Sequence, residues 1–167
     1  AKTLLVMDDT IGSEEKQIAP EAYKLIEEAF QWLNVKYDKK VIYKSDRLDI
    51  YYGYGEKLID KDKAYVCSCP QEELRKNREN RIACKCRNLS IKEQKNRWKE
   101  MFKAQAGEFV VRIKTDMLHK NPAFRDRVLF KISVRKHPRT GGKYKVWPTL
   151  EMSWAIDDHL LGITHII

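Results

Sequence analysis

Residues 2–10 have the sequence KTLLVMDDT, in which the continuous apolar run Leu4–Met7 is followed at once by Asp8 and Asp9. A short apolar run without alternation is typical of a strand that is buried on both faces, and such strands belong to parallel sheets. The two aspartates then lie at the carboxyl end of the strand, where open α/β sheets bind ligands. An Asp at this place is also a common turn residue, so both roles stay open. The stretch predicts an α/β protein.

The segments after this strand alternate between helix and strand. Pro20 and Glu21 begin a stretch whose apolar residues recur at three- and four-residue spacing, which predicts an amphipathic helix that ends near Asn34. Val41–Tyr43 is predicted to be a second strand. We expect Ser45 to cap the next helix. That helix would turn its apolar positions toward the core, at Leu48, Tyr51, Tyr52, Leu58 and Ile59.

Charge divides the chain into three parts. The 167 residues carry 33 basic and 24 acidic side chains, a net charge of +9. Residues 1–63 carry −2, residues 64–146 carry +14, and residues 147–167 carry −3. A basic block between two mildly acidic flanks is typical of a nucleic-acid-binding insertion. A well-solvated, Lys-rich surface would give the same count, so this alternative stays open.

The basic block has its own predicted architecture. Glu108–Lys114 and Phe130–Val134 alternate apolar and polar residues, and a glycine-containing turn at 140–143 precedes Tyr144–Val146. This pattern predicts three antiparallel strands. Ser90–Glu93 has the sequence of a capping box and predicts the start of a helix. Near the end of the chain, Asp157, Asp158 and His159 could form a metal or acid–base set, but three adjacent residues cannot all face one site in regular structure. The alternative is a loop with a capping Asp.

All four cysteines of the chain fall within twenty residues, as C-x-C, fourteen intervening residues and C-x-C. Two close pairs of thiolates, brought together by one chain reversal, supply a tetrahedral zinc ion with four ligands and leave no position for water. The predicted metal is therefore structural zinc. Two disulfides or an empty reduced site are the alternatives, and the absence of a secretion signal disfavours the disulfides. The predicted ligands are Cys67, Cys69, Cys84 and Cys86.

Composition excludes several other classes. Hydrophobic residues make up 43% of the chain, which is too many for a disordered or collagen-like protein. No run approaches the roughly 18 apolar residues of a membrane helix. The apolar stretch near the start is too short for a signal peptide, because acidic residues follow it at positions 8 and 9. We expect a cytoplasmic monomer without membrane contact. The sequence has no P-loop, no nucleophile elbow and no glycine fingerprint of a dinucleotide site.

Several short segments together resemble one family. They include Asp8–Thr10, Pro20–Tyr23, Ser45–Arg47, Ala64–Cys69, Cys86–Leu89, Val111–Asp116, Asn121–Ala123, His137–Gly141 and Asp157–His165. In order and spacing they resemble the interior of an archaeal-type glutamyl-tRNA synthetase of class I, over essentially the whole chain. Glutaminyl-tRNA synthetases are relatives, but the cysteine pairs favour the glutamyl side.

The resemblance implies a fold and a partner. Residues 1–63 and 147–167 would form part of a Rossmann-type catalytic domain, and residues 64–146 an inserted α+β domain that binds the acceptor stem of tRNA, here tRNA-Glu. In relatives the cysteine cluster binds zinc, and Asp8 lies beside the amino group of the substrate. We expect RNA contacts from basic residues on the strands and turns of the insertion, namely Arg112, Lys114, Arg125, Lys131, Arg135, Lys136, Arg139 and Lys143.

The resemblance also implies what the printed sequence lacks. The family's HIGH and KMSKS motifs, which bind ATP, would lie before Ala1 and after Ile167. We therefore expect ATP to act only in the complete parent enzyme and expect no aminoacylation by this chain alone. The family has polar residues where this chain has Val6 and Leu150, so Asp8 would be a relic. Half of a split ligase, completed in trans, and an engineered scaffold without activity are the alternatives.

Overall fold

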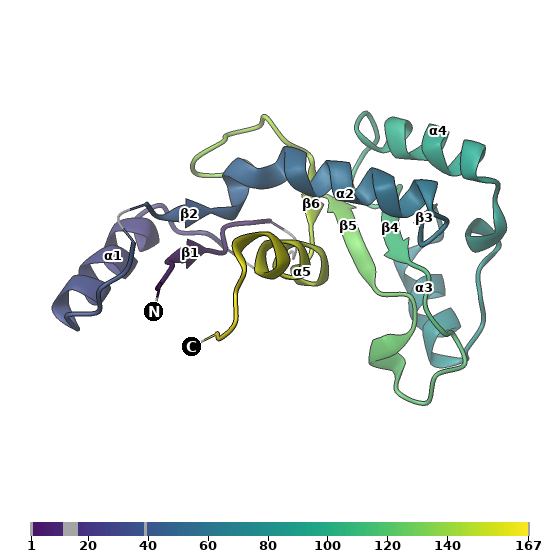
Figure 1. The fold of residues 1–167 in the computed structure, drawn as a ribbon. Coiled ribbons are helices and arrows are strands. Elements are labelled where there is room, and N and C mark those ends of the chain that lie inside the picture. The colour runs from purple at the N-terminus through teal and green to yellow at the C-terminus, as the bar shows by residue number, and fades with distance from the viewer. Residues whose placement is uncertain (1, 12–16, 39, 167) are drawn as a thin grey trace.

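The computed structural model describes residues 2–11, 17–38 and 40–166, and it shows a mixed α/β fold (Figure 1). The first part contains β1 (Val6–Met7), α1 (Ala22–Trp32), β2 (Ile42–Tyr43) and α2 (Leu48–Asp60). The second contains β3 (Ala64–Cys67), α3 (Gln71–Glu79), α4 (Ile91–Met101), β4 (Val110–Ile113) and β5 (Val128–Ile132). The chain continues with β6 (Val146–Pro148) and α5 (Leu150–Leu161).

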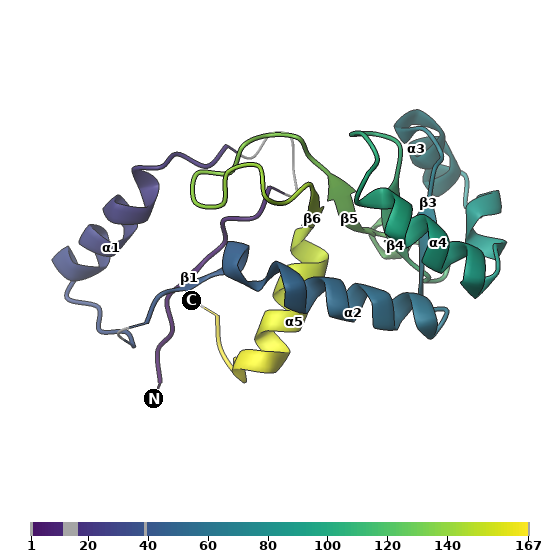
Figure 2. The same cartoon turned by 90° about the horizontal axis from the view of Figure 1, so that it is seen from above.

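The predicted parallel sheet is present as a pair of short strands. β1 pairs with β2 in parallel, with Val6 opposite Ile42 and Met7 opposite Tyr43. α1 connects the two strands and lies at one end of the elongated molecule, away from α3 and α4 (Figure 2). The prediction of a strand, a helix and a parallel strand is therefore confirmed. The first strand is shorter than the apolar run that predicted it.

The predicted antiparallel sheet is also present, in the order β3-β4-β5-β6. Alternation along the chain predicted three of these strands, and the structure adds β3 as a fourth. All four residues of β3 are buried, so its sequence lacks the alternation that predicted the other three strands. β6 begins at Val146, so the last residue of the predicted 64–146 insertion already belongs to a strand that continues beyond it.

Two local predictions fail for identifiable reasons. Ser45 does not cap α2: it lies in a 3-10 turn, Lys44–Arg47, and its side chain is buried against Asp9. Asp157, Asp158 and His159 lie within α5 and not in a loop. That helix ends at Gly162, which adopts the left-handed conformation at φ 64° that glycine accepts without strain. The predicted capping box is confirmed, with Ser90 and Glu93 bonded to each other's backbone amide.

One hydrophobic core crosses the predicted domain boundaries. It contains Leu48 and Tyr51 of α2 together with Val66, Phe130 and Trp147 of the antiparallel sheet. α2 runs along the molecule and packs against α4, β3 and α5 (Figure 2). α2 is therefore the element that joins the parallel pair of strands to the sheet. Among the described residues, no helix is long and apolar enough to cross a membrane.

The two glycines of α2 have different surroundings. A Cβ atom at Gly55 would lie 2.8 Å from Cε2 of Phe130, whose ring is fully buried within a cluster of aromatic side chains. A Cβ atom at Gly53 would meet nothing within 4 Å. The close approach of α2 to the sheet therefore requires glycine at position 55 only.

We expect Gly55→Ala to lower the free energy of unfolding by about 1–3 kcal/mol, because overpacking of a filled core outweighs the better helix propensity of alanine. Gly53→Ala is the matched control, and it should raise the same free energy by about 0.5–1 kcal/mol. Urea unfolding followed by circular dichroism measures both. Equal effects of the two substitutions would contradict the assigned role of Gly55.

Candidate metal centre and its surroundings

The structure brings the four predicted cysteines together. Cys67 ends β3, Cys69 follows it, and Cys84 and Cys86 lie at and within the 3-10 turn Lys85–Asn88. The four Sγ atoms all lie within 4.8 Å of one another, and those of Cys67 and Cys84 are 3.6 Å apart. All four are free cysteines, and Cys69 is the most exposed of them. Such a cluster can hold a metal ion.

Backbone turns allow the two cysteines of each C-x-C pair to reach one metal ion. In an extended strand, residues i and i+2 point to one face but lie far apart along it. Here the chain leaves β3 at Ser68, and the second pair is wound into the 3-10 turn that begins at Lys85. Both turns shorten the distance between the two sulfurs of a pair.

The surroundings favour thiolate at two of the cysteines. The pKa of Cys84 is lowered to about 5, mainly by its hydrogen bond with the Cys67 thiol. Contacts with Tyr65 and Arg112 lower this pKa further. The pKa of Cys67 is raised correspondingly. Burial disfavours the thiolate of Cys86, but hydrogen bonds from Ser68 and Arg97 lower its pKa below the ordinary value. Thiolates are the form in which cysteine binds metals.

Two of the predicted RNA-binding residues are internal. The guanidinium of Arg112 donates to the carbonyl oxygen of Asp126 and lies 3.8 Å from the sulfur of Cys84. Arg125 donates to carbonyl oxygens of α3 and of its own loop, at Arg78, Glu79, His119 and Lys120. Both residues are only 2% exposed, so in this structure neither presents its charge to a partner.

The other six residues lie closer to the surface. Lys114 forms an ion pair with Asp62. Lys131 and Arg135 are half-buried, on β5 and just after it. Lys136 and Lys143 are exposed in the segment that joins β5 to β6. Whether these side chains contact RNA stays a prediction.

Arg139 has a second role that the sequence did not indicate. Its guanidinium donates to Ser45 and Asp46, at 2.7 and 2.9 Å, and stacks over the ring of Tyr43 at 3.7 Å. Arg139 thereby fastens the segment between β5 and β6 to β2 and the turn after it. Figure 1 shows this segment extending over the start of α2.

Asp9 makes the hydrogen bonds that hold together the carboxyl ends of the parallel strands. The carboxylate of Asp9 accepts hydrogen bonds from the amide and hydroxyl of Ser45, at 2.8 and 2.7 Å, and from Tyr23. Its carbonyl oxygen accepts a 2.6 Å bond from Nε2 of His137. Asp8 remains 22% exposed and lies 3.9 Å from the ammonium of Lys44. A substrate contact of Asp8 stays a prediction.

Comparisons with known proteins agree on one family. The family model described as class I tRNA synthetases (E and Q), catalytic domain, matches residues 2–167. Glutamate–tRNA ligases of Methanothermobacter marburgensis and Pyrococcus horikoshii are 45% and 48% identical to the chain over 166 and 168 residues. Each alignment covers 99% of this chain, which spans only 29% of the length of those relatives.

A solved structure has a similar fold. A crystal structure of a glutamate tRNA ligase from Elizabethkingia meningosepticum, in complex with its amino acid, superposes with a TM-score of 0.59 and 23% identity. The superposition covers 91% of this chain and 34% of that one.

We expect Arg139→Ala to lower the free energy of unfolding by about 1–2 kcal/mol, because it removes charge-assisted hydrogen bonds that join distant segments. Lys136→Ala, in the same segment and exposed, should change it by less than about 0.5 kcal/mol. Thermal and urea unfolding of both variants measure the difference. If the two variants are equally stable, Arg139 does not fasten the segment.

Proposed function

Because the chain belongs to the family of class I tRNA synthetases for glutamate and glutamine, as part of their catalytic domain, we propose that it is the tRNA acceptor-stem-binding part of a glutamate–tRNA ligase. The longer relatives carry the name glutamate–tRNA ligase. For this chain we infer a binding role, with the acceptor end of tRNA-Glu as the partner.

One observation carries this proposal, namely a stretch of basic residues without acidic ones. Between Asp126 and Glu151 the sequence has seven basic residues and no acidic residue. The stretch forms β5, β6 and the segment between them, where Lys136, Arg139, Lys143 and Lys145 are exposed. This hairpin-like unit of the antiparallel sheet therefore presents positive charge without an acidic residue in its own sequence. Such a surface is complementary to the phosphates of a nucleic acid.

The family supports tRNA as the nucleic acid that this surface would bind. RNA duplexes are recognised through their shape, their phosphates and the 2′-hydroxyls of the wide minor groove. Lysine and arginine side chains on strands and turns suit such contacts, and they carry little sequence information. We therefore infer binding with weak sequence preference and strong dependence on salt.

The four cysteines would hold structural zinc. In a tetrahedral site with Zn–S distances of about 2.3 Å, neighbouring sulfurs are about 3.8 Å apart. The 3.6 Å between Cys67 and Cys84, and the limit of 4.8 Å for the whole set, fit these distances. Four cysteine sulfurs also match the ligands that zinc prefers in closed structural sites. The ion would fix the turn at Lys85–Asn88 against β3.

We expect the purified chain to contain about one equivalent of zinc, measured by inductively coupled plasma mass spectrometry. Every cysteine of the chain lies in the cluster, so all four thiols should be protected from alkylation until a chelator removes the metal. Removal should also lower the unfolding temperature, because metal binding contributes to folding free energy. Metal-free protein with four freely reactive thiols would contradict the zinc site.

We expect Lys136→Ala combined with Lys143→Ala to weaken binding of tRNA-Glu and to reduce the slope of log K against log salt by about 2, one for each lost phosphate contact. The control is Lys36→Ala with Lys61→Ala, which removes the same charge from exposed positions outside the basic stretch. Fluorescence anisotropy across a salt series measures both. Equal loss in the two double variants would show that only net charge matters and would contradict the proposed surface.

A further inference from the structure

Asp126 is a buried carboxylate between the cysteine cluster and the loop of residues 115–126, which joins β4 to β5. It accepts hydrogen bonds from the Tyr65 hydroxyl at 2.8 Å and the Thr115 amide at 2.7 Å, and it forms an ion pair with Arg87. Its backbone has φ 36°. A residue with a side chain holds this left-handed conformation only where its surroundings fix it.

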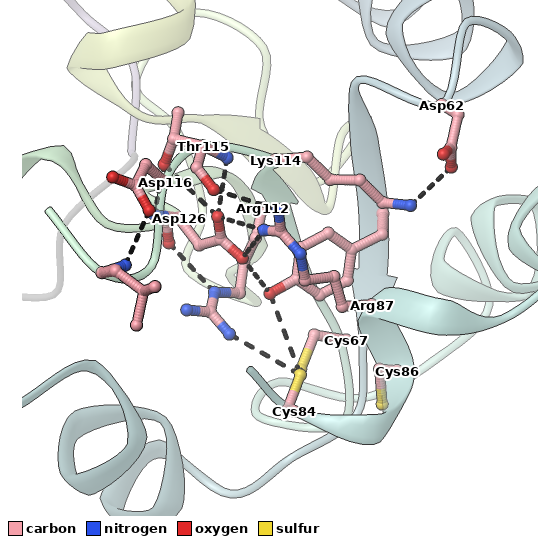
Figure 3. A network of polar contacts seen from close by, with 12 residues as sticks. Asp62, Cys67, Cys84, Cys86, Arg87, Arg112, Lys114, Thr115, Asp116 and Asp126 are labelled. Atoms are coloured by element: carbon pink, nitrogen blue, oxygen red, sulfur yellow. Dashed lines mark hydrogen bonds and ion pairs between the residues drawn. The ribbon is translucent and has the colours of Figure 1, made fainter. Parts of the chain in front are cut away.

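Two side chains connect Asp126 with the sulfur of Cys84. Arg112 donates from Nε to the carbonyl oxygen of Asp126 at 3.0 Å, and its Nη1 lies 3.8 Å from Cys84 Sγ. The Tyr65 hydroxyl donates to the carboxylate of Asp126 and lies 3.8 Å from the same sulfur. Figure 3 shows Arg112 reaching both Asp126 and Cys84. The two connections run side by side, because Tyr65 and Arg112 face each other across β3 and β4.

Asp126 also closes the 115–126 loop at its base. The amide of Asp126 donates to Thr115 Oγ1 at 2.6 Å. In return, the amide of Thr115 donates to the carboxylate of Asp126. Arg87, which is adjacent to Cys86 in the sequence, donates to the carbonyl oxygen of Thr115 at 3.0 Å. The closed loop exposes Leu118 and Phe124 to solvent. Asp126 therefore ties the end of the loop to its start at Thr115. It also contacts Tyr65 and Arg112, the two side chains that lie against Cys84.

We propose that metal binding at the four cysteines and closure of the 115–126 loop stabilise each other through Asp126. The inference rests on the proposed metal site and adds a regulatory role to it. A metal ion bound to Cys84 would fix the sulfur against which Arg112 and Tyr65 lie. Four thiolates around a divalent ion carry a net negative charge, which also strengthens the attraction for the buried Arg112.

The coupling must act in both directions. If metal binding favours the closed loop by a given factor, then closing the loop favours metal binding by the same factor. A change at Asp126 should therefore alter metal affinity although Asp126 ligates no metal. Outer residues that orient metal ligands typically change affinity by about 10- to 100-fold.

The first test compares two aspartates of the same loop. Asp126→Asn should weaken zinc binding about tenfold, measured by competition with a chromophoric chelator. Asp116→Asn is the matched control: the carboxylate of Asp116 accepts a bond from the amide of Leu118, within the loop, and its substitution should leave the affinity within about twofold. Circular dichroism establishes that both variants are folded. If Asp126→Asn does not fold, Thr115→Val removes the hydroxyl that accepts from Asp126 and is expected to weaken binding in the same direction.

The second test measures the reverse effect by hydrogen exchange. Removing zinc from the wild-type chain should speed deuterium uptake in peptides covering residues 115–125, while peptides from α2 should be unchanged. Zinc binding with equal affinity in wild type and Asp126→Asn, and with no change of exchange in the loop, would overturn the coupling and leave the zinc site intact. Failure of the wild-type chain to bind zinc would overturn both proposals.

Discussion

The structure depends on the requirement that a buried carboxylate be matched by hydrogen-bond donors. Asp9, Asp126 and Asp157 are each almost fully buried, and each collects donors from segments far apart in the sequence. Asp9 joins the end of β1 to Ser45, and Asp157 joins α5 to Arg47 and Tyr51 of the region around α2. An unpaired carboxylate inside a protein is costly, so loss of the donors in any of these arrangements would be destabilising.

Buried backbone carbonyl oxygens also need donors, which explains why several basic residues are used inside the chain. The +14 charge of residues 64–146 suggests a surface, but Arg112 and Arg125 serve the interior and Arg139 connects two segments. A bidentate, permanently charged guanidinium is suited to such internal roles because it satisfies several acceptors at once. On the hairpin of β5 and β6 four basic residues remain exposed, namely Lys136, Arg139, Lys143 and Lys145. The charge count of the block therefore overstates the charge that its surface carries.

The main hydrophobic core and the cysteine cluster hold together different parts of the molecule. The main core holds α2, α4 and the antiparallel sheet together and crosses the boundaries at residues 64 and 146. The cysteines form a second, smaller cluster with Tyr65 and Leu74 at the far end of β3. Few apolar side chains are available there, because α3 is almost entirely polar. A metal ion would supply the cohesion that this end of the chain lacks in apolar contacts.

The sequence by itself determined the elements with strong local signals: the buried run before Asp8, the periodic helix after Pro20, the Ser90 capping box and the paired cysteines. Their physics is local, so spacing and residue type are sufficient. It also carried the resemblance to glutamyl-tRNA synthetases, which the family comparison confirms. Only the tertiary structure decided that Ser45 binds Asp9, that β3 completes the sheet, and that Arg112 lies inside. These outcomes depend on partners far apart in the sequence, such as Ser45 and Asp9, which are 36 residues apart, and no local pattern encodes such a contact.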